Sequence, residues 1–161
     1  MSNMKKASNI GLSFGLTSAT ITTLGLIMGL DAGTGSKLAV AAGVLTIAVA
    51  DSFSDALGVH VAKEAEGNFS HRQVWQATIA TFWYKFIFAL TFLIPVLLLP
   101  ERWSILVALI WGMIILVFLN YRIAKITKQR PISVILEHLL VSGAVIVLSR
   151  LAGLLISRLL T

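Results

Sequence analysis

Five long apolar runs divide this sequence, and they constrain its fold more than any other feature. A helix needs about 20 largely apolar residues to cross a bilayer. The runs that meet this length are about 10–30, 38–62, 75–99, 103–121 and 133–156. The longest polar link, about 62–74, is too short to fold as a soluble domain. We therefore predict an all-α protein with a single transmembrane domain of five helices over residues 1–161, an integral, multi-pass membrane protein.

Composition supports a membrane protein and excludes several functional classes. Hydrophobic residues make up 57% of the chain and charged residues only 12%, against roughly a quarter charged in soluble domains. Cysteine is absent, which excludes disulfides, thiolate metal sites and cysteine nucleophiles. The three histidines are widely spaced and form no H-E-x-x-H motif, so we expect neither an enzyme nor a permanently bound cofactor.

The basic residues predict how the chain sits in the membrane. A net charge of +6 would suit nucleic acid, but the lysines and arginines flank the apolar runs, so we expect no nucleic-acid partner. With the N-terminus in the cytoplasm, the inner links hold Lys5, Lys6, Lys63, Arg72, Arg122, Lys125, Lys128 and Arg130, and the outer side holds Lys37, Arg102 and Arg158. This asymmetry predicts a cytoplasmic N-terminus and an external C-terminus, in the cell membrane if the source is prokaryotic.

The first apolar run carries a stripe of small residues. Its members alternate in steps of four and three: Gly11, Gly15, Ser18, Thr22, Gly25 and Gly29. Small residues let helix backbones approach closely in lipid, so the stripe predicts a helix-packing face. A second row, Ser13, Thr17 and Thr20, either faces a polar interior or bonds back to its own helix.

Two acids near the middle of the second run are the strongest functional signal. Asp51, Ser54, Asp55 and Gly58 are spaced i, i+3, i+4 and i+7, which places them on one helix face. An acid at the bilayer centre costs about 2.5–3.5 kcal/mol on insertion scales. Two interpretations stay open: the pair binds a cation or protons, or it is neutralised and only holds the bundle together.

A lysine and a histidine–glutamate pair complete the set of candidates. Lys85 lies near the middle of the third run on the same face as Thr78 and Thr81, and its best-placed partner is Asp51. Such a pair is either fixed or opened by a cation during transport. His60 and Glu64, spaced i, i+4, form either a metal-binding pair or an ordinary solvated helix end.

The order of these motifs resembles the vacuolar iron transporter-like family. GLSFGLT (residues 11–17) is similar to the family's Gly-Leu-Ser-Asp-Gly-Leu motif, with Phe14 in place of the acid. SDALGVHVAKEAE (residues 54–66) is similar to a second-helix motif of the family, with Asp55 at a methionine position and His60 at a tyrosine position. Weaker similarity follows in FALTFLIPVLLLP and LEHLLVSGAVIVLSRLAGLLI.

The resemblance implies a dimeric transporter of iron or manganese whose path is lined by the positions of Phe14 and Asp55. The chain departs from the family in two ways. It lacks the first-helix acid, and only KEAEGNFSHRQ stands where better-known members carry a Glu-rich cytoplasmic metal-binding domain.

Together these features predict a secondary transporter that exchanges a divalent cation, Fe²⁺ or Mn²⁺, for protons. The expected ligands are Asp51, Asp55 and Ser54, with Ser13, Thr17, His60 and Glu64 as weaker candidates. The expected assembly is a homodimer through the small-residue stripe of the first helix. The alternative is a non-transporting subunit or scaffold in which Lys85 neutralises Asp51 and Asp55.

Overall fold

The protein is a bundle of helices. The computed structural model describes residues 3–160, and the side chains of residues 9 and 11–160. Its elements are α1 (Asn3–Thr34), α2 (Lys37–Ala65), α3 (His71–Thr91), α4 (Leu93–Leu98), α5 (Glu101–Thr127) and α6 (Pro131–Leu160). Five segments are long and apolar enough to cross a membrane, α3 and α4 together forming one of them (His71–Leu98). The predicted all-α fold with five possible spans is confirmed by the length and composition of the helices.

The helices extend beyond the predicted boundaries, because a helix continues through polar ends that a hydropathy pattern cannot mark. Residues 31–34, which follow the predicted span 10–30, belong to α1. The chain reverses only at Gly35, whose φ of 54° suits glycine, and at Ser36, whose hydroxyl accepts a hydrogen bond from the N–H of Ala39 at 3.2 Å. Likewise α5 runs to Thr127 and ends at Lys128 in the left-handed conformation.

The third span, predicted as continuous over 75–99, is interrupted at Phe92. Pro95 has no N–H to donate to the carbonyl of Thr91, four residues earlier. The N–H of Phe92 instead bonds to the carbonyl of Ala89 at 3.2 Å, a tighter turn than an α-helix makes. The helix then resumes as the short α4.

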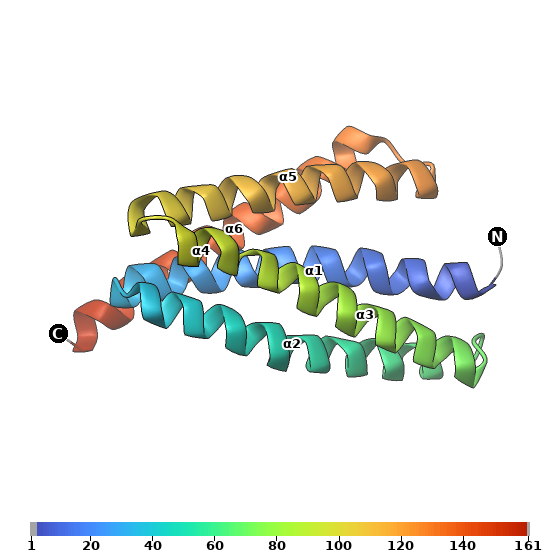
Figure 1. Ribbon diagram of the computed structural model, residues 1–161. Helices are drawn as coiled ribbons and strands as arrows, with labels where there is room; N and C mark the ends of the chain where they lie inside the picture. Colours follow the sequence, from blue (N-terminus) through green and yellow to red (C-terminus); the bar gives the residue numbers. More distant parts are fainter. Residues whose placement is uncertain (1–2, 161) are drawn as a thin grey trace.

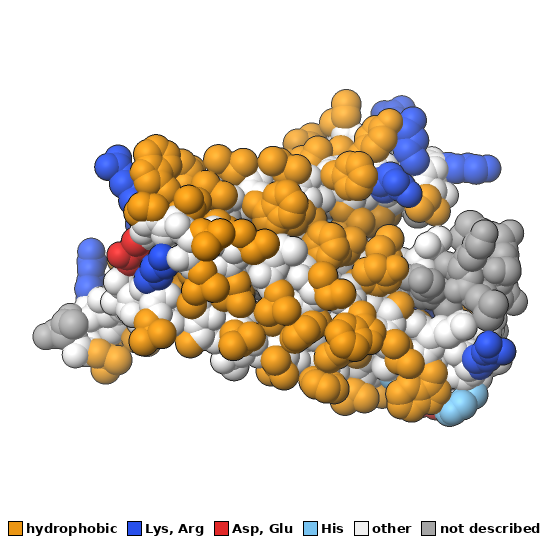
Figure 2. Space-filling model, in the orientation of Figure 1, with side chains coloured by type: hydrophobic (Ala, Val, Ile, Leu, Met, Phe, Trp, Pro, Cys, Tyr) orange, Lys and Arg blue, Asp and Glu red, His pale blue; other side chains and the backbone are white. Residues whose placement is uncertain are grey.

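Neighbouring helices run antiparallel and bring the links together at two ends (Figure 1). The N-terminus lies at the same end as the α2–α3 and α5–α6 links, and the C-terminus lies at the opposite end. Apolar side chains cover the middle of the visible face, with basic side chains toward the ends (Figure 2). The basic residues predicted to share the inner side therefore share one end, apart from Lys5 and Lys6, whose side chains lie outside the described residues. The orientation itself stays a prediction.

Helix α1 is the centre of the bundle and packs against α2, α3, α5 and α6. The main apolar core lies beside it, between α1, α2, α4 and α5. Its buried members include Leu24 and Ile27 of α1, Val44 of α2 and Phe92. Burial of α1 on several sides fixes where its polar residues can point.

The small-residue stripe of α1 is a packing face, as predicted, but its partners are in the same chain. A methyl group added at Gly11 or Gly15 would touch α3, and one added at Gly25 or Gly29 would touch Val145 or Ser149 of α6. Contacts with α3 and α6 therefore account for these glycines within one chain, and the homodimer stays a prediction.

The closest approach of α1 and α6 generates a stability prediction. A Cβ at Gly153 would overlap the backbone oxygen of Gly29, whereas one at Gly143, in the same helix, has nothing within 4 Å. Gly153→Ala should therefore lower the free energy of unfolding by about 1–3 kcal/mol through overpacking, and Gly143→Ala should not. Thermal melting of the two variants in detergent checks this, and equal melting temperatures would contradict the close contact.

Candidate functional site

One face of α3 is polar and buried. Thr78, Thr81 and Lys85 follow each other at i, i+3 and i+7 on one face, as predicted, and the structure encloses all three. Each threonine hydroxyl donates to a backbone carbonyl one turn earlier. Lys85 makes no such bond within its own helix among the described residues, and its side chain is only 1% exposed. Its ammonium group must therefore find acceptors on neighbouring helices.

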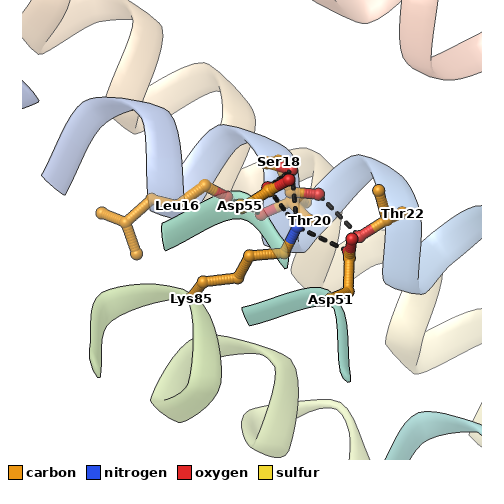
Figure 3. Close-up of polar contacts among 7 residues, drawn as sticks. All are labelled: Leu16, Ser18, Thr20, Thr22, Asp51, Asp55 and Lys85. Atoms are coloured by element: carbon orange, nitrogen blue, oxygen red, sulfur yellow. Dashed lines mark hydrogen bonds and ion pairs between the residues drawn. The ribbon is translucent and has the colours of Figure 1, made fainter. Parts of the chain in front are cut away.

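Those acceptors are the two acids of α2 (Figure 3). The Nζ atom of Lys85 lies 2.5 Å from Oδ2 of Asp51 and also forms a hydrogen-bonded ion pair with Oδ2 of Asp55. The predicted pairing with Asp51 is confirmed, and Asp55 joins it. Within the described part of the chain, Oδ2 of Asp51 accepts no hydrogen bond, so its contact with Lys85 is electrostatic.

Ser18 of α1 closes the arrangement from a third helix. Its hydroxyl donates to Oδ2 of Asp55 at 2.6 Å and accepts from Nζ of Lys85 at 2.8 Å. We call Ser18, Asp51, Asp55 and Lys85 the ion-pair cluster. Because each member of the Ser18–Asp55–Lys85 ring bonds the other two, the cluster ties α1, α2 and α3 together.

The two acids are less enclosed than the lysine. The side chains of Asp51 and Asp55 are 25% and 21% exposed. On the Asp51 side an open groove lies between α1 and α2, lined by Thr22, Leu26, Gly43, Thr46, Ile47, Ala50, Asp51 and Ser54. The carboxylate of Asp51 can thus be reached from the groove without passing the lysine.

The cluster lies far from both ends of its helices. Asp51 is at the midpoint of α2 (Lys37–Ala65), a segment long enough to span a membrane. Two ionised carboxylates and one ammonium group leave one formal negative charge there. A charge at this depth is costly unless a cation or a proton balances it.

The other predicted ligands lie elsewhere. Ser54 is exposed and lines the groove, but it makes no hydrogen bond to the cluster in the described residues. Ser13 lines a separate crevice beside α5. Thr17 has no contact with either acid among the interactions of the described residues, and Phe14, where the resemblance expects an acid, is 45% exposed on the outside of α1.

His60 and Glu64 do pair, with Nε2 and Oε1 3.7 Å apart. Nδ1 of His60 lies 3.0 Å from the hydroxyl of Thr78, and its ring packs edge-on against Trp75. These contacts bind the end of α2 to α3. In the part of the chain that the structure describes, no three His, Cys, Asp or Glu side chains converge as a metal site would require.

Ser18 is the member that sequence reasoning missed. Its spacing assigned it to the small-residue stripe, where its hydroxyl had no separate role. The stripe holds two hydroxyl residues, Ser18 and Thr22, and nothing in the spacing distinguishes the one that meets Lys85. Only the close approach of α1 and α3 makes that proximity evident.

Comparisons with known proteins identify no relative of this chain. No protein-family model, curated protein or solved structure matches this chain. The functional interpretation therefore depends on the ion-pair cluster itself.

Removing the ammonium group should destabilise the bundle. Lys85→Met keeps most of the side-chain volume but leaves two carboxylates without their counter-ion, which should cost about 3–5 kcal/mol. Lys63→Met is the matched control, since Lys63 pairs with Glu66 at a helix end where an ion pair contributes about 0–1 kcal/mol. Chemical denaturation in detergent measures both changes.

A compensated variant separates charge from packing. Lys85→Met combined with Asp51→Asn and Asp55→Asn should recover much of the lost stability, because no uncompensated charge remains. If the single and triple variants are equally unstable, the lysine matters for its packing and the electrostatic account is wrong.

Proposed function

We propose that this chain is a secondary transporter that exchanges a divalent cation for protons across a membrane. In the proposed cycle the cation takes the place that the Lys85 ammonium group holds between Asp51 and Asp55. The observation that carries the proposal is the convergence of two mid-span carboxylates on one cationic group.

Charge balance supports exchange with protons. The cluster with all groups ionised has a formal charge of −1, so it favours an incoming cation over an empty state. When a divalent ion binds both carboxylates, the Lys85 ammonium loses its place and is repelled by the ion. Release of its proton leaves neutral lysine, two carboxylates and one divalent ion, and the cluster is then neutral.

The ligand chemistry favours a hard or borderline divalent ion. Asp51 and Asp55 offer carboxylate oxygens and Ser18 offers a neutral hydroxyl oxygen, and the chain has no cysteine to supply a thiolate. Oxygen ligands suit Mn²⁺, Fe²⁺, Mg²⁺ or Ca²⁺ better than copper. The resemblance to the vacuolar iron transporter-like family points to Fe²⁺ or Mn²⁺, and we propose these as the first ions to test.

A transported cation has access to the cluster from one side only in this conformation. Lys85 is enclosed, whereas Asp51 borders the groove between α1 and α2. We propose that the cation approaches the carboxylates from the groove and that the lysine withdraws along the polar face of α3. Thr81 and Thr78 lie on that face and give the neutral amine hydroxyl oxygens nearby.

A non-transporting scaffold is the second candidate, and one observation favours it. The Ser18–Asp55–Lys85 ring already satisfies the ammonium group, as a purely structural tie between three helices would require. In that case the wild-type protein binds no divalent metal and the ion pair never opens.

Flux measurements distinguish the two candidates. Asp55→Asn should abolish Mn²⁺ and Fe²⁺ uptake into proteoliposomes that carry a pH gradient, because the site loses a ligand charge. Asp31→Asn makes the same chemical change near the end of α1 and should leave uptake within about twofold of wild type. Wild-type uptake by folded Asp55→Asn would reject the site, and no uptake of any divalent ion by the wild type would favour the scaffold.

A further inference from the structure

A second feature of the bundle is a deep apolar crevice between α1, α3 and α5. Its volume is about 540 Å³, within the range of pockets that hold small molecules. Apolar side chains form most of its wall, chiefly Leu12, Leu16, Phe88, Ile115, Phe118 and Leu119. It shares no residue with the ion-pair cluster.

The crevice exists because α5 diverges from the helices beside it. In Figure 1, α5 leans away from α1 toward the end that holds the N-terminus. At its inner limit the two sides meet, where Nε1 of Trp111 donates to the hydroxyl of Thr91 at 3.0 Å. The crevice is a wedge that extends from Trp111, near the middle of α5, past Arg122 toward the end of the helix.

The open end is polar and positively charged. Asn9 and Arg122 line the crevice there. The guanidinium carbon of Arg122 lies 6.0 Å from the ring centre of Phe118, which holds the side chain against the wall. Lys125 follows one turn later on α5, and Lys128 and Arg130 lie in the adjoining link.

The length of the crevice along α5 matches the thickness of one leaflet of a bilayer. Trp111 and Arg122 are about 16 Å apart along α5 at about 1.5 Å per residue. Half of a hydrocarbon core about 30 Å thick is about 15 Å. An acyl chain whose headgroup lies beside Arg122 would therefore reach the inner limit of the wedge.

We propose that one anionic phospholipid occupies this crevice, with its acyl chain between α1 and α5 and its phosphate on Arg122. Arginine binds phosphate through a planar pair of donors, and basic pockets between membrane helices bind anionic headgroups. A zwitterionic lipid makes the same apolar contacts with the crevice, but its headgroup carries no net charge and is attracted less strongly by the basic end. The site is independent of the proposed transport function.

Native mass spectrometry of the full chain in detergent tests the site, with phosphatidylglycerol and phosphatidylcholine as probes. Phosphatidylglycerol should bind more tightly, and Arg122→Gln should weaken it about tenfold, equivalent to about 1.4 kcal/mol. Arg130→Gln is the matched control, since it removes the same charge from the same end without lining the crevice. It should change binding less than about twofold.

A second variant tests the apolar wall. Ser13→Leu places a larger side chain inside the crevice and keeps every basic residue, so it should reduce binding of both lipids. Equal affinity for the two lipids, or equal losses in Arg122→Gln and Arg130→Gln, would overturn the proposal. So would a dimer that retains no lipid, because a second copy would then fill the crevice.

Discussion

The ammonium group of Lys85, held between two carboxylates in the middle of an apolar bundle, is the interaction on which the rest of the structure depends. A charge this far from the ends of apolar helices is costly without a partner, so each group needs one within the protein. Three helices supply them: Ser18 from α1, Asp51 and Asp55 from α2, and Lys85 from α3. The positions of these helices are therefore fixed by electrostatics as well as by packing.

Glycines in α1 allow the neighbouring helices to pack closely enough for these charged groups to meet. A Cβ at Gly15 would lie 3.3 Å from the backbone nitrogen of Lys85 and 3.0 Å from the backbone oxygen of Thr81. With no side chain there, α3 comes close enough to α1 for Lys85 to reach Ser18. Further along α1, Gly25 and Gly29 admit α6 in the same way. One stripe thus serves two neighbours, and it positions the site at one of them.

The sequence predicted the parts of this structure that depend on local pattern. Apolar run length predicted five spans, and the i, i+4 spacing placed Asp51 and Asp55 on the face that meets Lys85. Contacts that depend on how helices cross were not predictable in this way. Ser18 belongs to the ion-pair cluster and Ser54 does not, and the glycine stripe packs against helices of the same chain. These contacts depend on how each helix is rotated and which helix it meets, and the whole bundle sets both. Helix ends were misplaced where polar residues continue a helix, as at residues 31–34.

In the proposed function, Lys85 and a divalent cation compete for the same two carboxylates. The most direct test is proton release when Mn²⁺ binds purified protein in weakly buffered detergent, since metal binding displaces protons from its site. Wild-type protein should release about one proton per Mn²⁺ bound, and Lys85→Arg, whose guanidinium group keeps the positive charge but cannot lose its proton, should bind Mn²⁺ more weakly and without that release. Equal proton release by both proteins, or no binding of Mn²⁺ by the wild type, would show that Lys85 and the cation do not compete.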